Sequence, residues 1–436
     1  MKKNDSIVAS CVDYSEQGYG VVKIEGFCIF VKGLLKGEVA KIKLTAMKKN
    51  YGYAIIEELF EPSKNRVVEK CEIASVCGGC QLQHMNYEEQ LNFKQNSIER
   101  LFERNHLECK VNSIIAGDDS HRYRNKVQVP FGVDKEGKLI YGFYRNHSND
   151  IIQLDDCKIQ SEQSNRLLLE IQQLLSEAIN QKHLRHVLIK HMQNSDEIMV
   201  VFVAWKHFEE LNKIVEALVK KHNNIKSCIL NINTYDDNVI LGKKEYLLYG
   251  ENYVKDDLMG KTFLLSSKSF YQINSAQTAK LYQQTLSLAN IQKNDVVLDL
   301  YGGIGTIGIL ASDFAKKVIT VEVVKEAIED GKNNAKLNQI ENIEFFCGDV
   351  KKFMSQYHES VDIIIVDPPR KGIDVETISS MLEMKAKRIV YVSCNPNTLI
   401  RDLKLMNEDY HIEVVQPVDM FPHTRHTEVI VLLQKS

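Results

Sequence analysis

The amino-acid sequence predicts a protein of several domains that ends in an α/β domain with a parallel sheet. Its 436 residues exceed what one hydrophobic core usually organises, because domains average roughly 150 residues. The first sixty residues alternate short β-type runs with glycines, whereas from residue 266 near-continuous apolar runs alternate with helical segments, as in sheets buried on both faces. We therefore expect an OB-like β-barrel at 1–60, an α+β central domain at 61–265 and a Rossmann-like α/β domain at 266–436.

The composition is that of a soluble globular protein. Of the residues, 44% are hydrophobic and 26% charged, and no run is long enough to span a bilayer. The N-terminal segment lacks the apolar stretch of roughly 7–15 residues that a secretion signal requires, so we expect a cytoplasmic protein without a membrane partner. The net charge of -3 means that any surface for nucleic acid must be local. Ten cysteines in such a chain indicate metal binding or thiol chemistry rather than disulfides.

Short β-type runs in the first sixty positions predict the barrel. They lie at 19–22, 27–31, 38–44 and 53–56. Lysines gather near two tyrosines in the second half, at Lys41, Lys43, Lys48, Lys49, Tyr51 and Tyr53. Such a set suits phosphate contacts and base stacking, and a solvated lysine face explains it equally well. The segment resembles the TRAM domain, a small β-barrel RNA-binding module appended to RNA-modifying enzymes.

The central region is expected to mix helices and strands. A helical period spans 87–108, and this helix is also a candidate to pack on the C-terminal domain. Apolar runs at 126–129 and 139–143 flank the turn sequence at 134–137, which predicts a hairpin. Basic and aromatic residues interleave around it, at Arg122, Tyr123, Arg124, Lys126, Tyr144, Arg145 and His147. They form a second candidate surface for RNA.

A glycine-rich turn follows the first strand of the C-terminal domain. The strand is expected at 296–300, and a helix opens at Thr306. Between them, Gly303 and Gly305 allow a tight turn and a close approach of the backbone to a ligand. Together with Gly308 they satisfy G-x-G-x-x-G, so a nicotinamide or flavin enzyme has to be considered.

The acids that end successive strands argue for a different cofactor. Asp299 stands just before the glycine turn, where a carboxylate repels a pyrophosphate and attracts the ammonium group of a methionine moiety. Glu322 ends the next strand and suits ribose hydroxyls, and Asp349 ends the third and can accept from an adenine amino group. Structural capping explains any one of these acids but less easily all three. The pattern therefore favours S-adenosylmethionine.

Two further predicted strands are each followed by residues that could take part in the reaction, at the same carboxyl edge of the sheet. The fourth is followed by Asp367-Pro368-Pro369-Arg370, where the prolines end the ladder, and similar turns place planar substrates in methyltransferases. The fifth is followed by Ser393-Cys394-Asn395-Pro396. An amino nitrogen can attack a methyl donor directly, whereas uracil C5 becomes nucleophilic only after a thiolate adds to C6. Cys394 is therefore the expected nucleophile of carbon methylation.

Carbon methylation also needs a base that removes the C5 proton. The C-terminal run holds three candidates, Glu428, His423 and His426. A partly desolvated carboxylate at the start of the last strand could have a suitably raised pKa. The residues alone do not decide among the three.

The C-terminal motifs resemble the RNA uracil-5-methyltransferase family, and the resemblance extends along the chain. It rests on residues 393–396 and on His426-Thr427-Glu428-Val429. It implies Cys394 as the nucleophile, Glu428 as the base and S-adenosylmethionine as the methyl donor. It also implies that Gln272 lines the site and that cofactor contacts fall at Tyr301, Thr306, Glu322, Asp349 and Asp367, beside the turn glycines Gly303 and Gly305. Some members carry asparagine at the position of Thr306.

A cysteine knuckle lies near the start of the central domain. Cys71, Cys77 and Cys80 depart from the usual zinc-finger spacing, and three clustered cysteines favour zinc or an iron-sulfur cluster about equally. The ribosomal RNA branch of the family joins such a knuckle to a later cysteine, which implies a [4Fe-4S] cluster on these three residues and Cys157. We expect a structural or RNA-orienting role, because methyl transfer needs no electron.

The leading hypothesis is therefore a monomeric enzyme that methylates C5 of a uridine in 23S ribosomal RNA. tRNA is the alternative substrate, and the ribosomal branch is preferred because the tRNA enzymes generally lack both barrel and knuckle. Methylation of an RNA cytosine or amino group is a further alternative. A catalytically silent RNA-binding or redox-sensing protein is the rival from another class, against which the set of Cys394, Glu428, Asp367 and Gln272 argues.

Overall fold

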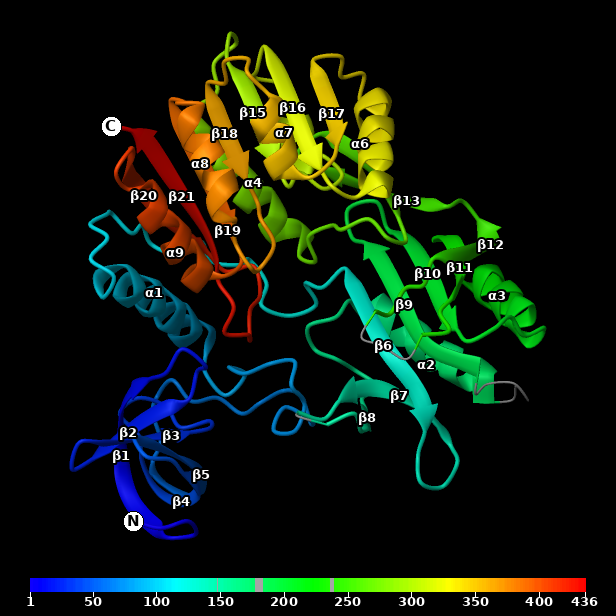
Figure 1. Cartoon of the computed structure of the whole chain (residues 1–436). Coiled ribbons are helices and arrows are strands. Elements are labelled where there is room, and N and C mark those ends of the chain that lie inside the picture. Colours follow the sequence, from blue (N-terminus) through cyan, green and yellow to red (C-terminus); the bar gives the residue numbers. More distant parts are fainter. Residues whose placement is uncertain (147, 177–182, 236–238) are drawn as a thin grey trace.

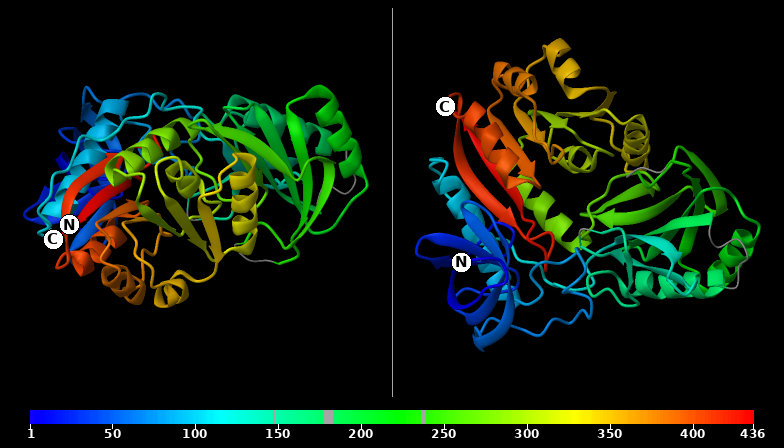
Figure 2. Two further views of the ribbon diagram at one scale, coloured as in Figure 1. Left: turned by 90° about the horizontal axis from the view of Figure 1, so that it is seen from above. Right: turned by 60° about the horizontal axis from the view of Figure 1, so that its bottom comes forward.

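The computed structural model describes residues 1–146, 148–176, 183–235 and 239–436. The chain forms a small barrel, a central sheet and a C-terminal sheet, and the barrel and helix α3 of the central part lie at opposite ends of the molecule (Figures 1 and 2). His147, part of the second basic and aromatic surface, lies outside the described residues. None of the helices in the described ranges is long and apolar enough to cross a membrane.

The N-terminal segment is a closed barrel in the strand order β1-β2-β3-β5-β4, which confirms the expected architecture. Its strands are β1 (Ser6–Tyr14), β2 (Gly20–Ile24), β3 (Phe27–Val31), β4 (Val39–Met47) and β5 (Tyr51–Glu61). β3 and β5 pair in parallel, and the other neighbours pair antiparallel. Alternate residues, including Ile29, Val31 and Ile42, fill the interior, so the neighbouring positions face outward.

The central sheet has the order β12-β11-β10-β9-β6-β7-β8. Its elements are β6 (Lys126–Val133), β7 (Leu139–Tyr144), β8 (Ile151–Gln153), α2 (Glu162–Ser176), β9 (Leu184–Met192), β10 (Glu197–Ala204), α3 (Glu210–Lys221), β11 (Ile225–Ile232) and β12 (Lys244–Gly250). The predicted hairpin is confirmed, because β6 and β7 pair antiparallel around a turn in which the Asp134 amide donates to the Lys138 carbonyl at 2.9 Å. α2 and α3 share one apolar cluster with the sheet.

A hairpin of β13 (Tyr253–Leu258) and β14 (Lys261–Ser266) leads into the C-terminal sheet. Val254, Leu258 and Phe263 from this hairpin pack in one apolar cluster with Met199 of β10 and Val297 of the C-terminal sheet. The hairpin therefore joins the two larger sheets.

The C-terminal sheet has the order β17-β16-β15-β18-β19-β21-β20. Its elements are α4 (Ser275–Ala289), β15 (Val296–Leu300), α5 (Thr306–Ala311), β16 (Lys317–Glu322), α6 (Lys325–Leu337), β17 (Ile343–Cys347), α7 (Val350–Gln356), β18 (Ile363–Val366), α8 (Val375–Glu383), β19 (Arg388–Ser393), α9 (Pro396–Met406), β20 (Tyr410–Val418) and β21 (Glu428–Lys435). From β17 to β19 all neighbours pair in parallel, whereas β21 is antiparallel to β19 and β20. The predicted α/β domain is confirmed, and its chain order reverses between β15 and β18, where open α/β sheets bind ligands.

Helix α1 (Tyr87–Glu103) packs on the C-terminal sheet. Asn86 caps it by accepting from the Glu89 amide at 2.8 Å, and it ends five residues before the predicted boundary. Its Ile98, Leu101 and Phe102 share an apolar cluster with strands of the C-terminal sheet. α1 therefore forms a wall between the barrel and the sheet (Figure 1).

Candidate active site

The glycine turn after β15 is shaped by its neighbours. Gly303 and Gly305 have φ values of 57° and 74°, which favour glycine, and Tyr301 also adopts a positive φ of 61°. A Cβ on Gly305 would lie 2.6 Å from the Phe345 ring, and one on Gly308 would lie 2.8 Å from Asp299 Oδ2. The turn therefore depends on the absence of side chains, as a loop that holds a ligand closely must.

Asp299 is buried beneath this turn with one oxygen unsatisfied. Oδ2 accepts from the Gly308 amide at 3.1 Å and from the Thr320 hydroxyl at 3.2 Å. Oδ1 has no hydrogen-bond partner within the described ranges. Burial raises the pKa of this carboxyl to about 7. An unpaired buried acceptor at the carboxyl edge suits a cationic donor such as an amino group, so the residues fit the predicted methyl donor.

Glu322 and Asp349 stand at the same edge, after β16 and β17. Glu322 accepts from the Gly303 amide at 3.1 Å and from the Val324 amide at 2.9 Å. Asp349 caps α7 by accepting from the Lys352 amide at 3.2 Å. Capping thus accounts for part of the pattern of acids. Each carboxylate can accept further hydrogen bonds, so both remain available to a ligand.

The two loops that follow β18 and β19 are tied together. Asn395 caps α9 and donates from Nδ2 to the Arg370 carbonyl at 2.9 Å. Thr398 donates from its hydroxyl to the same carbonyl at 3.2 Å. Cys394 therefore has a defined place beside the Asp367–Arg370 turn. Its thiol lines a cavity of about 240 Å³ together with Arg370, His426 and residues of α1.

The pairing of β19 with β21 places Glu428 near Cys394. Ser393 pairs with Val429 across the antiparallel strands β19 and β21, so the next step outward places Cys394 opposite Glu428. The Glu428 side chain is only 3% exposed. Burial raises its pKa to about 8, the negative charge of Asp367 adds to this rise and Arg370 opposes it. Burial likewise raises the pKa of Asp367 to about 7. Glu428 is thus a carboxyl whose proton is exchangeable near neutral pH.

The surroundings of Cys394 favour the protonated thiol over the thiolate. Burial, together with the charges of Glu428 and Asp367, raises the pKa of the thiol to about 11, and the charge of Arg370 opposes this rise. Cys394, Glu428, Asp367 and Arg370 thus lie close enough to influence one another's charge, and of these four Cys394 and Arg370 line the cavity. Such a set can carry addition to a polarised double bond followed by proton removal.

Gln272 lies just before α4. It is buried, its carbonyl accepts from Asn125 Nδ2 at 2.9 Å, and its side chain hydrogen-bonds the hydroxyl of Tyr282. The Tyr282 hydroxyl is itself near Asp299, Asp367 and Glu428. Sequence reasoning missed Tyr282, because a tyrosine among apolar helix positions looks like an ordinary core residue.

The two histidines of the C-terminal run have different surroundings. His426 lines the Cys394 cavity. The His423 ring instead contacts Gln90 Nε2 at 3.1 Å through Nδ1, and its carbonyl accepts from the Gln81 and Leu82 amides, each at 2.9 Å. Burial lowers the pKa of both histidines to about 4. His423 therefore anchors the loop and does not face Cys394.

The four predicted cluster cysteines converge. Cys71, Cys77, Cys80 and Cys157 line one cavity of about 430 Å³, beside Arg124 and Lys126. Within the part of the chain that the structure describes, no three His, Cys, Asp or Glu side chains form a group that could hold a metal ion. Four thiols without a carboxylate or imidazole are nevertheless the donor set of an iron-sulfur cluster or of a zinc site made of four cysteines, so the residue types fit.

Comparisons with known proteins cover nearly the whole chain. An uncharacterised RNA methyltransferase of Oceanobacillus iheyensis is 42% identical over 99% of this chain and 97% of its own length. One of Staphylococcus aureus (strain MRSA252) is 41% identical over 99% of this chain and 98% of its own length. The crystal structure of Pyrococcus abyssi tRNA (uracil-54, C5)-methyltransferase, in complex with S-adenosyl-L-homocysteine, superposes with a TM-score of 0.77 at 25% identity, covering 98% of this chain and 100% of that one.

The matching family covers both the α1 wall and the complete C-terminal sheet. Its description is tRNA (uracil-5-)-methyltransferase, and its sequence profile matches residues 86–436. The match includes the glycine turn, the Asp367 turn, Cys394 and Glu428. The chain therefore belongs to the tRNA (uracil-5-)-methyltransferase family and is an S-adenosylmethionine-dependent RNA methyltransferase.

Proposed function

We propose that this protein methylates C5 of a uridine in structured RNA, with Cys394 as nucleophile and Glu428 as base, and that 23S ribosomal RNA is its substrate. The observation that carries the proposal is the register of β19 and β21, which puts the thiol opposite the buried carboxyl. Both stand at the edge where the glycine turn and Asp299 offer a site for the methyl donor. A thiol is the group that carbon methylation needs and nitrogen methylation does not.

The reaction begins when the Cys394 thiol gives its proton to solvent and the resulting thiolate adds to C6 of the uracil. The new bond from Sγ to C6 uses the electron pair of the C5–C6 double bond, which moves into an enolate on C4 and its oxygen. The enolate then attacks from C5, and S-adenosylmethionine supplies the methyl group as an electrophile and departs as S-adenosylhomocysteine. Because C5 then carries both a methyl group and a proton, one proton has to leave.

Glu428 removes that proton in its carboxylate form. The electron pair of the C5–H bond restores the C5–C6 double bond and expels the Cys394 thiolate. A pKa near 8 suits this task, because a base whose pKa is close to the working pH both accepts and releases a proton readily. A cationic ligand beside Asp367 favours the charged forms of Asp367 and Glu428, which readies the carboxylate.

The methyl donor is proposed to lie over the glycine turn. Its amino group would meet the unpaired Oδ1 of Asp299. Glu322 and Asp349 follow the neighbouring strands, where the ribose and adenine would lie. The remaining proposed contacts are Gln272, Tyr301, Gly303, Gly305, Thr306 and Asp367. The Pyrococcus relative, whose crystal structure contains S-adenosyl-L-homocysteine, supports this placement.

The cysteine cavity is proposed to hold a [4Fe-4S] cluster on Cys71, Cys77, Cys80 and Cys157. Support comes from the four thiols that line one space. A cluster of several irons is larger than one ion, so its ligands stand further apart than the ligands of zinc. The cluster would supply rigidity to the knuckle, whose next residues, Gln81 and Leu82, hold the His423 carbonyl.

tRNA is the second candidate substrate, and one observation favours it. The Pyrococcus enzyme, which by its description acts on tRNA, aligns along 98% of this chain and therefore shares the barrel. A barrel alone is thus no reason to prefer ribosomal RNA. The proposed TRAM-like role of the barrel in gripping the strand applies to either substrate.

The test incubates the protein with labelled S-adenosylmethionine and, separately, undermodified 23S ribosomal RNA and undermodified tRNA, followed by nucleoside analysis. We expect 5-methyluridine at a defined position of the ribosomal RNA, and Cys394→Ala to abolish it. If only tRNA becomes labelled, the substrate is tRNA and the assignment to 23S ribosomal RNA is wrong. Label in 5-methylcytidine, or in an amino group, would overturn the uridine chemistry.

A further inference from the structure

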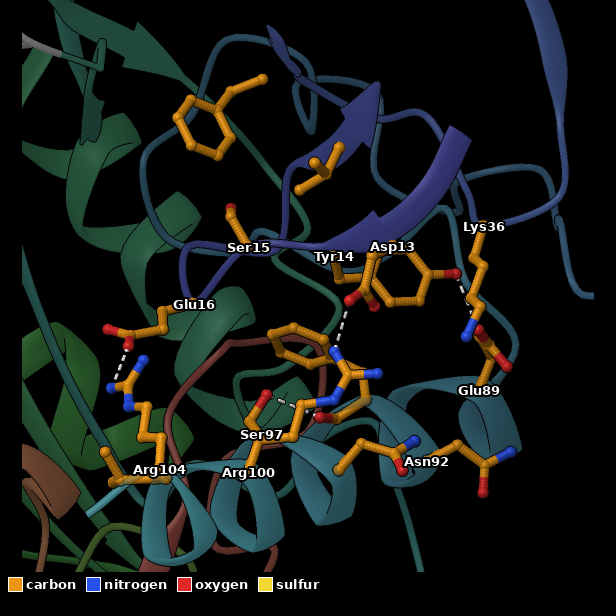
Figure 3. A pocket seen from close by; sticks show the side chains of 15 residues that line it. Asp13, Tyr14, Ser15, Glu16, Lys36, Glu89, Asn92, Ser97, Arg100 and Arg104 are labelled. Atoms are coloured by element: carbon orange, nitrogen blue, oxygen red, sulfur yellow. Dashed lines mark hydrogen bonds and ion pairs between the residues drawn. The ribbon is translucent and has the colours of Figure 1, made fainter. Parts of the chain in front are cut away.

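A cleft of about 460 Å³ separates α1 from the barrel (Figure 3). Phe93, Ser97 and Leu101 on the α1 side and Glu16 on the barrel side line both this cleft and the Cys394 cavity. The two spaces therefore abut, and a path leads from the thiol along α1 to the barrel. The volume falls within the range of roughly 300–1,000 Å³ that is typical of pockets for small ligands.

The α1 side of the cleft carries a row of polar residues at intervals of four, which places them on one helix face. The row consists of Asn92, Asn96, Arg100 and Arg104. Arg100 pairs with Asp13 at 2.6 Å, and Arg104 pairs with Glu16 at 2.5 Å, each through a partly exposed contact (Figure 3). The two arginines inside the cleft are thereby neutralised.

The side-chain amides of Asn92 and Asn96 are available to a ligand. Both are exposed, and neither side-chain amide has a hydrogen-bond partner among the residues that the structure describes. An amide carries two donors and a carbonyl acceptor, which is the pattern that reads the edges of nucleobases. Glu16 adds an acceptor at the junction with the Cys394 cavity.

The barrel side of the cleft begins an aromatic surface. Phe30 lines the cleft and points away from the barrel interior. The centroid of its ring lies 5.8 Å from the ring centroids of Tyr51 and Tyr53. Tyr51 and Tyr53 are exposed, and Lys41 and Lys43 lie on the outer face of the neighbouring strand β4. Exposed aromatic rings beside lysines are typical of surfaces that stack unpaired bases and follow a phosphate backbone.

We propose that the cleft between α1 and the barrel receives an unpaired nucleobase adjacent to the target uridine, and that the strand then runs over Phe30 to Tyr53 and Tyr51. This rests on the proposed function, since the target base is taken to occupy the Cys394 cavity. An uncharged base fits the cleft better than a phosphate does, because both arginines of the cleft are already paired with acids. The phosphates would follow the rim near Lys36, which forms no ion pair among the described residues.

Photocrosslinking tests the path in the full-length protein. A benzophenone amino acid replaces Asn96, and a matched variant carries it at Glu103, which is exposed on α1 and lines neither space. Each variant is irradiated with undermodified 23S ribosomal RNA and with undermodified tRNA, and crosslinked nucleotides are mapped. We expect position 96 to crosslink within a few nucleotides of the methylated uridine and position 103 to give several-fold less product.

A bound RNA that crosslinks equally from both positions, or only far from the methylated uridine, overturns the proposed path. Binding is measured separately by gel shift, and methylation by nucleoside analysis. Failure of the chemistry would show as bound and crosslinked RNA without 5-methyluridine. Failure of the path would show as methylated RNA without the crosslink from position 96.

Steady-state kinetics give an independent readout. Phe30→Ala removes the ring that begins the stacking surface, whereas Phe60→Ala removes an exposed ring near the far end of β5 that does not line the cleft. We expect Phe30→Ala to raise KM for RNA by about tenfold with kcat nearly unchanged, and Phe60→Ala to change neither. Equal behaviour of the two variants would contradict a stacking role for Phe30.

Discussion

Cys394 stands opposite Glu428 where β19 ends and β21 begins, one step beyond the pair formed by Ser393 and Val429. Directly opposite side chains in an antiparallel ladder have Cβ atoms roughly 4.5–5.5 Å apart. The last strand of the sheet, which runs against its parallel neighbours, therefore delivers the carboxyl to the thiol. Asp367 raises the pKa of both Cys394 and Glu428, and Arg370 lowers the pKa of both.

Replacing Glu428 with Gln should trap the reaction after methyl transfer. Without the carboxylate, the C5 proton of the adduct stays in place and the thiolate cannot leave. We expect a protein-RNA complex that survives denaturing electrophoresis, together with multiple-turnover activity reduced by about a thousandfold or more.

The matched control is the double variant Cys394→Ala/Glu428→Gln, which should form no such complex. Cys394→Ala alone should lose activity to a similar extent and keep its melting temperature, because the thiol is only half-buried. A stable complex in the absence of Cys394, or full activity of Cys394→Ala, would falsify the covalent mechanism.

The same Glu428→Gln change should alter how stability depends on pH. Burial raises the pKa of Glu428 from its ordinary 4.5 to about 8 in the folded protein, so the fold holds a proton that the unfolded chain has released. The resulting stabilisation is complete below about pH 4.5 and is lost as the pH rises through 8. Glutamine cannot release a proton, so between pH 5 and pH 8.5 the stability of the variant relative to the wild type should rise by on the order of 4 kcal/mol.

Urea denaturation of the ligand-free proteins at several pH values measures this difference. Glu359→Gln, at an exposed position, serves as the comparison and should give the same pH dependence as the wild type. A constant difference between wild type and Glu428→Gln across the range would mean that Glu428 has an ordinary pKa.

Much of the C-terminal domain could be predicted because its strands are buried on both faces. β16 and β19 are mostly apolar runs that end in Glu322 and Ser393, and Asp367 directly follows the apolar strand β18. The first strand of the barrel, β1, was not predicted because some of its apolar residues face solvent. Val8 and Val12 face outward with 61% and 47% exposure, so β1 shows no alternation of apolar and polar residues.

The choice of base could not be made from the sequence, because it depends on contacts between distant segments. His423 is turned away by Gln90 and by the backbone of Gln81 and Leu82, more than 300 residues earlier in the chain. The meeting of Lys94 with Asp419 is equally non-local. A lysine in an amphipathic helix is expected to face solvent, and only the fold reveals that this one is buried.

The pair of Lys94 and Asp419 should be a major source of stability for the loop before Glu428. Both side chains are fully buried, the Nζ to Oδ1 distance is 2.5 Å, and Tyr87 also donates to Asp419 at 2.9 Å. Lys94→Met leaves a buried carboxylate without its cation, so we expect about 3 kcal/mol of destabilisation by urea denaturation.

Removing both charges should restore most of that loss, because the double variant Lys94→Met/Asp419→Asn buries no unpaired ion. Arg100→Met on the same helix breaks only a partly exposed ion pair and should cost less than about 1 kcal/mol. If Lys94→Met and Arg100→Met lose the same free energy, the buried pair is not what anchors the loop.

The cysteine cavity makes a prediction that metal analysis can check. Anaerobically purified protein should contain iron and acid-labile sulfide in equal amounts, and Cys80→Ser should lose both, because a thiolate is the preferred ligand of iron in such clusters. Cys347→Ser changes an exposed cysteine outside the cavity and should keep the full iron content. Zinc in place of iron, lost on the Cys80 change, would instead identify a zinc site made of the four cysteines.

Asp299 should affect cofactor binding and stability in opposite directions. Asparagine can still accept from the Gly308 amide and the Thr320 hydroxyl, but it removes the negative charge that faces an incoming ammonium group. Hydrogen bonds to charged groups contribute roughly 1.5–3 kcal/mol, so Asp299→Asn should weaken S-adenosylmethionine binding by about 10- to 100-fold in calorimetry. The ligand-free variant should nevertheless be more stable than the wild type above pH 7, because burial raises the pKa of Asp299 to about 7 and ionisation there destabilises the fold.

Asp313→Asn, on the protein surface at the end of the following helix, should change neither property by a comparable amount. The opposite signs are the decisive feature, since general damage to the fold would lower affinity and stability together. A variant that binds S-adenosylmethionine as tightly as the wild type would show that the unpaired Oδ1 does not meet the amino group. The ammonium would then have to be held elsewhere at this edge, where Glu322 and Asp367 are the remaining carboxylates beside the glycine turn.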